Sequence, residues 1–104
     1  MIQNHLRHVV LFGFKAGTAP EAIETIAAAF ARLPEQIDGI SHFEWGENVS
    51  PEGLDRGLTH CFLLHFVSEA ARDAYLVHPA HIAFGKLLEP HLEKVCVIDY
   101  QPQE

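Results

Sequence analysis

The segment RHVVLFGF, residues 7–14, constrains the fold more than any other part of the chain. Valine, leucine and phenylalanine favour β-strands, and successive side chains of a strand point to opposite faces. The strand expected over residues 5–15 therefore has His8, Val10, Phe12 and Phe14 on one face and Arg7, Val9 and Leu11 on the other. Both faces are largely apolar, so the sheet that contains this strand needs a cover on each side.

The remaining periodicities predict three helices and three further strands. A helix is expected from Thr18, which stands at capping-box spacing from Glu21, to Pro34. Glycine, proline and charged residues at 48–58 indicate an exposed hairpin loop. The other expected elements are strands at 39–49, 59–67 and 94–100, a helix after Ser68 that runs to about residue 77, and a helix over 79–89.

The resulting order, β-α-β-β-α-α-β, is the ferredoxin-like pattern of an α+β protein, in one domain over residues 1–104. The first and third strands are then neighbours, and His8 and His60 are expected to begin these strands and point the same way. The sheet face away from the helices is expected to carry Val9, Leu11, Trp45, Cys61, Leu63, Cys96 and Ile98. A face this apolar favours a partner, so we expect a homodimer with the two sheets packed face to face.

Charge and composition exclude several classes of partner and location. The formal net charge of −7 argues against nucleic acid and anionic membranes, which attract basic surfaces. No apolar run approaches the roughly 18–20 residues that span a bilayer, and the first residues do not resemble a signal peptide. Cys61 and Cys96 lie in apolar runs, which predicts buried, reduced thiols in a cytoplasmic protein.

The segment YLVHPAHIAFGK, residues 75–86, is the candidate reaction centre. Proline fits the first turn of a helix, so a helix should start at Pro79, with His78 just outside it and His81 in its first turn. The partial positive charge of a helix N-terminus disfavours an imidazolium, and a neutral imidazole can act as a base. A bend at the proline could bring the phenol of Tyr75 to His81.

Four segments, RHVVLFGFK, LTHCFLLHF, AYLVHPAHIAFG and VCVIDYQP, resemble the stress-responsive dimeric α/β-barrel family, over residues 8–102. The resemblance implies a ferredoxin-like monomer that pairs through its sheet into a barrel. Around HPAHIAFG it is closest to a plant polyketide cyclase of that family, which implies that His81 is the base and Tyr75 its assistant. The pocket that it implies is lined by His8, His60, Val10, Phe12, Phe30, Phe62, Leu76, His78, Phe84, Gly85, Val95 and Val97, with Phe30 in place of a tyrosine of the cyclase.

These features leave two main functions open. One is an enzyme without a cofactor, a cyclase, lyase or isomerase with a histidine base, acting on a small apolar or aromatic ligand. The other is a non-catalytic stress-response or ligand-binding protein of the same fold, and assembly beyond a dimer is a third possibility. A zinc site built from His8, His60, His78 and His81 is disfavoured, because no carboxylate is clearly aimed at that side and no HExxH motif occurs.

Two further residues have structural interpretations. Asp99 is expected to be a solvated charge. Gly85 allows either the close approach of a ligand or tight helix packing.

Overall fold

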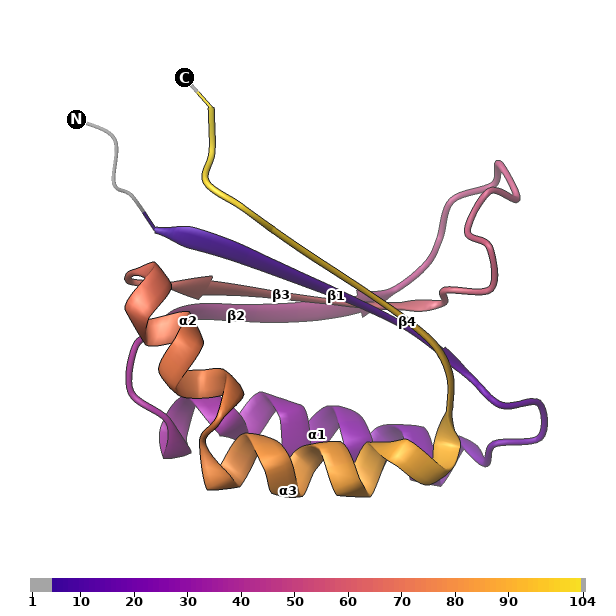
Figure 1. Ribbon diagram of the computed structural model, residues 1–104. Coiled ribbons are helices and arrows are strands. Elements are labelled where there is room, and N and C mark those ends of the chain that lie inside the picture. The colour runs from indigo at the N-terminus through magenta and orange to yellow at the C-terminus, as the bar shows by residue number, and fades with distance from the viewer. Residues whose placement is uncertain (1–4, 104) are drawn as a thin grey trace.

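The computed structural model describes residues 5–103 and confirms the ferredoxin-like α+β fold. Figure 1 shows a sheet in one layer and helices in a second layer beneath it. The elements are β1 (Leu6–Phe14), α1 (Pro20–Gln36), β2 (Ile40–Glu47), β3 (His60–Phe66), α2 (Glu69–Leu76), α3 (Pro79–Leu88), the 3₁₀ turn η1 (Glu89–His91) and β4 (Leu92–Tyr100).

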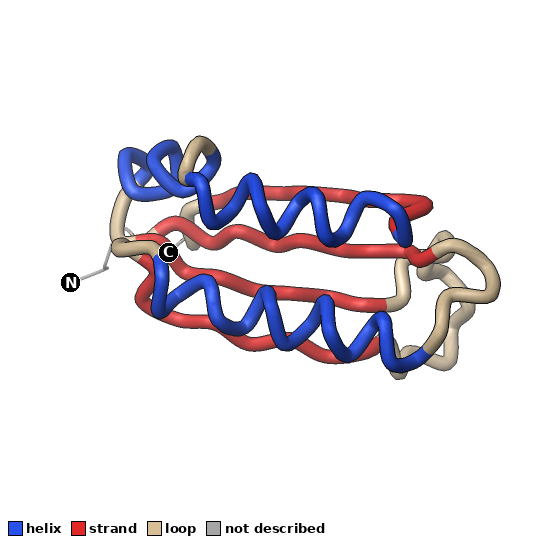
Figure 2. The backbone as a smooth tube through the Cα atoms, turned by 90° about the horizontal axis from the view of Figure 1, so that it is seen from below, coloured by secondary structure: helices blue, strands red, loops and turns tan. Residues whose placement is uncertain are grey.

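The sheet is antiparallel throughout, with the strand order β2-β3-β1-β4. β1 is central, and its Val10 lies between Phe62 on β3 and Val97 on β4. α1 and α3 lie side by side across the same face of the sheet, as Figure 2 shows from the helix side. Among residues 5–103, the helices therefore leave the other face, called here the open face, without a cover.

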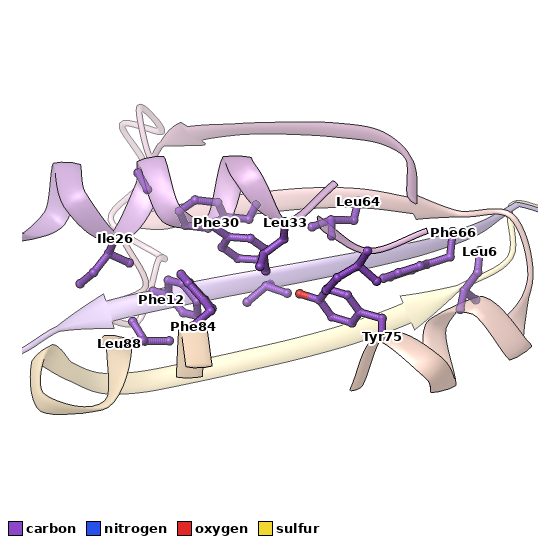
Figure 3. Close-up of a cluster of buried hydrophobic side chains, with 14 residues drawn as sticks. Leu6, Phe12, Ile26, Phe30, Leu33, Leu64, Phe66, Tyr75, Phe84 and Leu88 are labelled. Atoms are coloured by element: carbon purple, nitrogen blue, oxygen red, sulfur yellow. The ribbon is translucent and has the colours of Figure 1, made fainter. Parts of the chain in front are cut away.

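The core fills the layer between the helices and the sheet (Figure 3). Aromatic rings dominate its centre. The ring of Phe30 on α1 is stacked on Phe62 with centroids 4.6 Å apart, and it lies 4.7 Å from the ring of Phe84 on α3. Burial of each such side chain contributes roughly 1.5–3 kcal/mol, so these contacts fix both helices to the sheet. The remaining buried apolar residues are Leu6, Val10, Phe12, Ile26, Ala27, Leu33, Ile37, Leu64, Phe66, Tyr75 and Leu88.

The first helix differs from its prediction at both ends. α1 has Ala19 as its N-cap with no side-chain cap, so the predicted capping box is wrong. The Thr18 hydroxyl instead donates to the Lys15 carbonyl at 2.6 Å, inside the preceding turn. Pro34 lies within α1, which continues to Gln36, because a proline so close to the end removes few helical bonds.

The open face is apolar at its centre, as predicted, but Trp45 does not belong to it. Trp45 pairs with Phe62, and its ring is stacked on that phenyl ring at 5.4 Å on the helix-facing side. Side chains of directly paired residues on neighbouring strands lie on the same face of the sheet. The alternation within β2 does not say which of its two faces meets the helices, and the pairing of β2 with β3 does. Cys61 and Cys96 are free thiols, as predicted, but in the single chain Cys61 is exposed and Cys96 half-buried, rather than buried.

Within residues 5–103, no helix combines the length and the apolar composition that crossing a bilayer requires.

Candidate functional site

The turn between α2 and α3 builds the centre of the candidate site. Ser68 caps α2 as predicted, and its hydroxyl accepts a hydrogen bond from the Ala71 amide at 3.1 Å. α3 begins at Pro79, also as predicted, with His78 as its N-cap. The His78 Nδ1 accepts from the Ala80 amide at 3.0 Å, so this imidazole is engaged in holding the start of the helix.

Tyr75 and His81 come together as the sequence predicts. Their ring centroids are 4.4 Å apart, and Tyr75 is only 1% exposed. Figure 3 shows the Tyr75 hydroxyl pointing toward the middle of the layer between sheet and helices. His81 Nδ1 lies 3.2 Å from the Leu76 carbonyl oxygen, which can only accept, so Nδ1 carries the proton and Nε2 keeps its lone pair.

The surroundings favour the neutral form of both side chains. Burial lowers the pKa of His81, and the nearby His8 lowers it further, against the opposing effect of the Leu76 carbonyl. Burial also raises the pKa of the Tyr75 phenol. Near neutral pH the site therefore offers an uncharged imidazole beside an uncharged phenol, which suits proton transfer without a metal.

His8 extends this pair on the sheet side. It is 4% exposed, and its ring meets the edge of Tyr75 with centroids 5.8 Å apart. Its Nδ1 lies 2.6 Å from Asp99 Oδ1, and Asp99 Oδ2 accepts from Arg72 Nη1 at 2.7 Å. Asp99 is thus a partly buried, paired carboxylate, and its prediction as a solvated charge is wrong.

His60 does not join this cluster, although it shares the helix-facing side with His8. In the antiparallel register His8 pairs with Leu64 and His60 with Phe12. Four strand positions separate the two histidines, which is about 13 Å. The prediction that the two histidines begin neighbouring strands and share a face is confirmed, but the strands are antiparallel, so the two side chains lie toward opposite ends of the pair.

His60 lies at the hairpin-loop end of the sheet. Its Nδ1 lies 2.9 Å from the Thr59 hydroxyl, and its ring is stacked against Trp45 at 6.2 Å.

The other residues of the implied pocket divide into a core and an open margin. The core members are Val10, Phe12, Phe30, Phe62 and Phe84, all buried. At the margin, Val95 and Val97 on the helix-facing side of β4 and Leu76 on α2 are 52%, 53% and 43% exposed. An added Cβ on Gly85 meets no atom within 4 Å, which argues against the tight-packing interpretation of this glycine. The margin between α3 and β4 is therefore the accessible side of the site.

Two hollows of the described surface lie elsewhere. One of about 760 Å³ covers the open face next to the hairpin loop, and one of about 470 Å³ lies between α1 and Trp45. Neither is lined by Tyr75 or His81. Among residues 5–103 no group of three or more histidine, cysteine or acidic side chains is arranged to hold a metal ion.

Sequence reasoning missed Asp99 and Arg72 as members of the site. The local signal for Asp99 is weak, because an acidic residue at the end of a strand usually meets solvent. Only the register of β1 with β4, in which Asp99 is opposite His8, brings the carboxylate to the imidazole.

A family model described as the stress responsive A/B barrel domain matches residues 6–102. The chain belongs to this family. A stress-response A/B barrel domain-containing protein of Arabidopsis thaliana, HS1, is 42% identical over 97 residues, which cover 93% of this chain and 89% of the relative. The olivetolic acid cyclase of Cannabis sativa is 26% identical, over 95% of this chain and 98% of the cyclase.

Solved structures of similar proteins agree with the fold. The hydroxynitrile lyase of Passiflora edulis superposes with a TM-score of 0.88 at 27% identity, over 98% of this chain and 96% of the lyase. A ferredoxin-like protein of unknown function from Jannaschia sp., described as dimeric, has a TM-score of 0.82 at 27% identity over 94% of this chain and 99% of its own. Proteins of this fold thus include two enzymes and proteins described as dimers.

Proposed function

We propose that this stress-response A/B barrel protein binds a small apolar or aromatic ligand between α3 and β4 and acts on it as a cofactor-free cyclase or lyase. The observation that carries the proposal is the neutral imidazole of His81 packed against the buried phenol of Tyr75. The names of two relatives, olivetolic acid cyclase and hydroxynitrile lyase, support chemistry of this kind.

The proposed reaction begins with a proton transfer. His81 Nε2 takes a proton from a carbon next to a carbonyl, or from a hydroxyl, and the electron pair stays on the ligand as an enolate or alkoxide. The Tyr75 hydroxyl donates a hydrogen bond to that oxyanion. Ring closure or loss of a leaving group follows, and the proton returns from the imidazolium to the product or to water.

Turnover of mandelonitrile, followed by the release of benzaldehyde, tests the lyase form of this proposal. His81→Gln should lower kcat by on the order of 10²-fold, because the base is removed. Tyr75→Phe should lower kcat by a smaller factor, because only one hydrogen bond is lost. His91→Gln, in η1 and outside the site, is the matched control and should match the wild type. Equal turnover by the wild type and His81→Gln would refute the proposal.

A second candidate is a non-catalytic ligand-binding or stress-response protein of the same fold. The near-complete burial of Tyr75 favours it, because a ligand reaches the phenol only if the side chains around it move. Titration with the analogue benzyl alcohol, which lacks the nitrile group that leaves, followed by NMR, separates the two functions. Shifts at Tyr75 and His81 without any turnover of mandelonitrile would favour binding alone.

We also propose that two copies pair through their open faces in the cytoplasm. The support comes from an apolar strip that no other part of the described chain covers, with Ile98 56% exposed; its members are Val9, Leu11, Leu63 and Ile98. Similar proteins described as dimeric support a pair of chains. Size-exclusion chromatography with light scattering should give twice the 11.6 kDa chain mass. A mass of one chain at micromolar concentration would contradict the pairing.

A further inference from the structure

A chain of polar contacts links three elements behind the candidate site. Arg72 on α2 donates to Asp99 on β4 at 2.7 Å, and the other oxygen of Asp99 lies 2.6 Å from His8 Nδ1 on β1. His8 and Asp99 are direct cross-strand partners, so the register of the sheet fixes their approach. The side chains of His8, Arg72 and Asp99 are 5%, 20% and 22% exposed, which protects the contacts from competing water.

These contacts determine which nitrogen of His8 carries the proton. The Asp99 carboxylate only accepts hydrogen bonds, so His8 Nδ1 must donate to it. In the neutral imidazole the lone pair is then on Nε2. Arg72 occupies the second carboxylate oxygen and thereby fixes the plane of Asp99 and, through it, the ring of His8.

His8 Nε2 is available for a further contact. It has no hydrogen-bond partner among residues 5–103, and no polar side-chain atom of this part of the chain is both fully buried and unpaired. Nε2 therefore still touches space that a water-sized group can enter. The same ring packs on Tyr75, which also packs on His81, so both imidazoles contact one phenol.

The two imidazoles differ in what holds their Nδ1–H. His81 donates to a neutral carbonyl at 3.2 Å, whereas His8 donates to a carboxylate at 2.6 Å. A hydrogen bond to a charged acceptor is shorter and about twice as strong, and the carboxylate stabilises an imidazolium that forms beside it. Asp99 is thus in place to pair with an imidazolium that forms at His8, whereas His81 has no such carboxylate beside its Nδ1.

We infer that His8 is a second proton acceptor of the site and that Asp99 and Arg72 are the residues that position it. This inference rests on the proposed function. In the step assigned to His8, a C–H or O–H bond of the ligand breaks, its electron pair stays on the ligand, and the proton moves to His8 Nε2. The imidazolium is then paired with Asp99 until the proton passes to the product or to water.

NMR of the protein labelled with ¹⁵N-histidine tests the positioning without any ligand. Above pH 7.5 the wild type should have His8 protonated at Nδ1, with a far-downfield Nδ1 proton that reports the short bond to the carboxylate. Asp99→Asn should shift the tautomer toward Nε2–H, because an amide can donate as well as accept. Asp73→Asn is the matched control, because Asp73 binds Arg72 Nε at 2.8 Å and has no contact with His8. A His8 protonated at Nε2 in the wild type, or unchanged in Asp99→Asn, would overturn the inference.

A proton-abstraction assay with 5-nitrobenzisoxazole tests the acceptor role. Removal of its C–H proton breaks the N–O bond and releases a coloured phenolate. We expect Asp99→Asn to lower kcat by on the order of 10²-fold with KM nearly unchanged, and Asp73→Asn to have no effect. If Asp99→Asn fails to fold, Arg72→Lys provides the second variant, with a smaller loss of kcat. Full kcat in a folded Asp99→Asn or His8→Gln protein would overturn the acceptor role.

The tautomer measurement separates this inference from the proposed function. A correct tautomer together with full mandelonitrile turnover by His81→Gln would remove the proposed function and leave the positioning of His8 standing. A His8 tautomer protonated at Nε2, together with slow mandelonitrile turnover by His81→Gln, would remove the positioning of His8 and leave the proposed function standing.

Discussion

Replacement of Gly85 by alanine should raise the stability of the free protein while it weakens ligand binding. Gly85 lies inside α3, where glycine is about 0.8–1 kcal/mol less favourable than alanine. An added Cβ has no atom within 4 Å, so no steric cost offsets this gain. The expected stabilisation is about 1 kcal/mol, which corresponds to a rise in Tm of roughly 4 °C or more for a domain of this size. Gly85 follows His81 by one helical turn and shares its face, so the new methyl group should occupy ligand space.

Urea unfolding followed by circular dichroism, at one protein concentration, measures the gain in stability. Gly13→Ala is the contrasting control, because a Cβ there would overlap the Gly57 carbonyl oxygen on the neighbouring backbone. This variant should lose roughly 1–3 kcal/mol. A Gly85→Ala protein less stable than the wild type would refute the reasoning, since it would require tight packing against Gly85. Unchanged ligand affinity in a stabilised Gly85→Ala protein would instead contradict the placement of the ligand.

Three other changes test separate parts of the structure. Phe30→Tyr adds a hydroxyl to a ring that is 1% exposed, so it should lower the free energy of unfolding, measured with urea, by about 1–3 kcal/mol. A Phe30→Tyr protein as stable as the wild type would contradict this prediction. Leu63→Glu places a charge on the open face and should yield single chains in light scattering. Leu87→Glu on α3 is the control and should remain a dimer. A dimeric Leu63→Glu protein would argue against the proposed interface. Burial and neighbouring cationic groups lower the pKa of His65 from the usual 6.5, and burial also lowers the pKa of His81. Below pH 6.5 the unfolded chain therefore binds more protons at these two side chains than the folded chain does. The contribution of these two histidines to the free energy of unfolding should be fully present above pH 6.5 and should be lost as the pH decreases through that value. A double His65→Gln, His81→Gln variant should therefore show a smaller difference in the free energy of unfolding between pH 5.5 and pH 7.5 than the wild type.

The fold was largely predictable because its signals are local. Alternating apolar residues define β1 and β3, and Ser68 and Pro79 mark two helix starts through their own side chains. The start of α1 was mispredicted because Thr18 has two acceptable hydrogen-bonding arrangements, and the turn to Lys15 competes with the helix cap. The side of the sheet on which Trp45 lies depends on strand pairing, which no local pattern contains.

The candidate site was predictable only where its members are near in sequence. Tyr75 and His81 are joined by one turn, so the proline that starts α3 is enough to bring them together. His8 and Asp99 are 91 residues apart, and their contact depends on the register of two strands. The separation of His60 from His8 has the same origin, since strand direction decides which ends of the two strands meet.

The exposed thiol of Cys61 on the open face makes the lifetime of a paired barrel measurable. If two sheets close over this face, a bulky thiol reagent reaches Cys61 only when the protomers separate. The rate of labelling would then become independent of reagent concentration once modification outpaces reassociation. The limiting rate would equal the rate at which the barrel opens, with no need for an introduced probe.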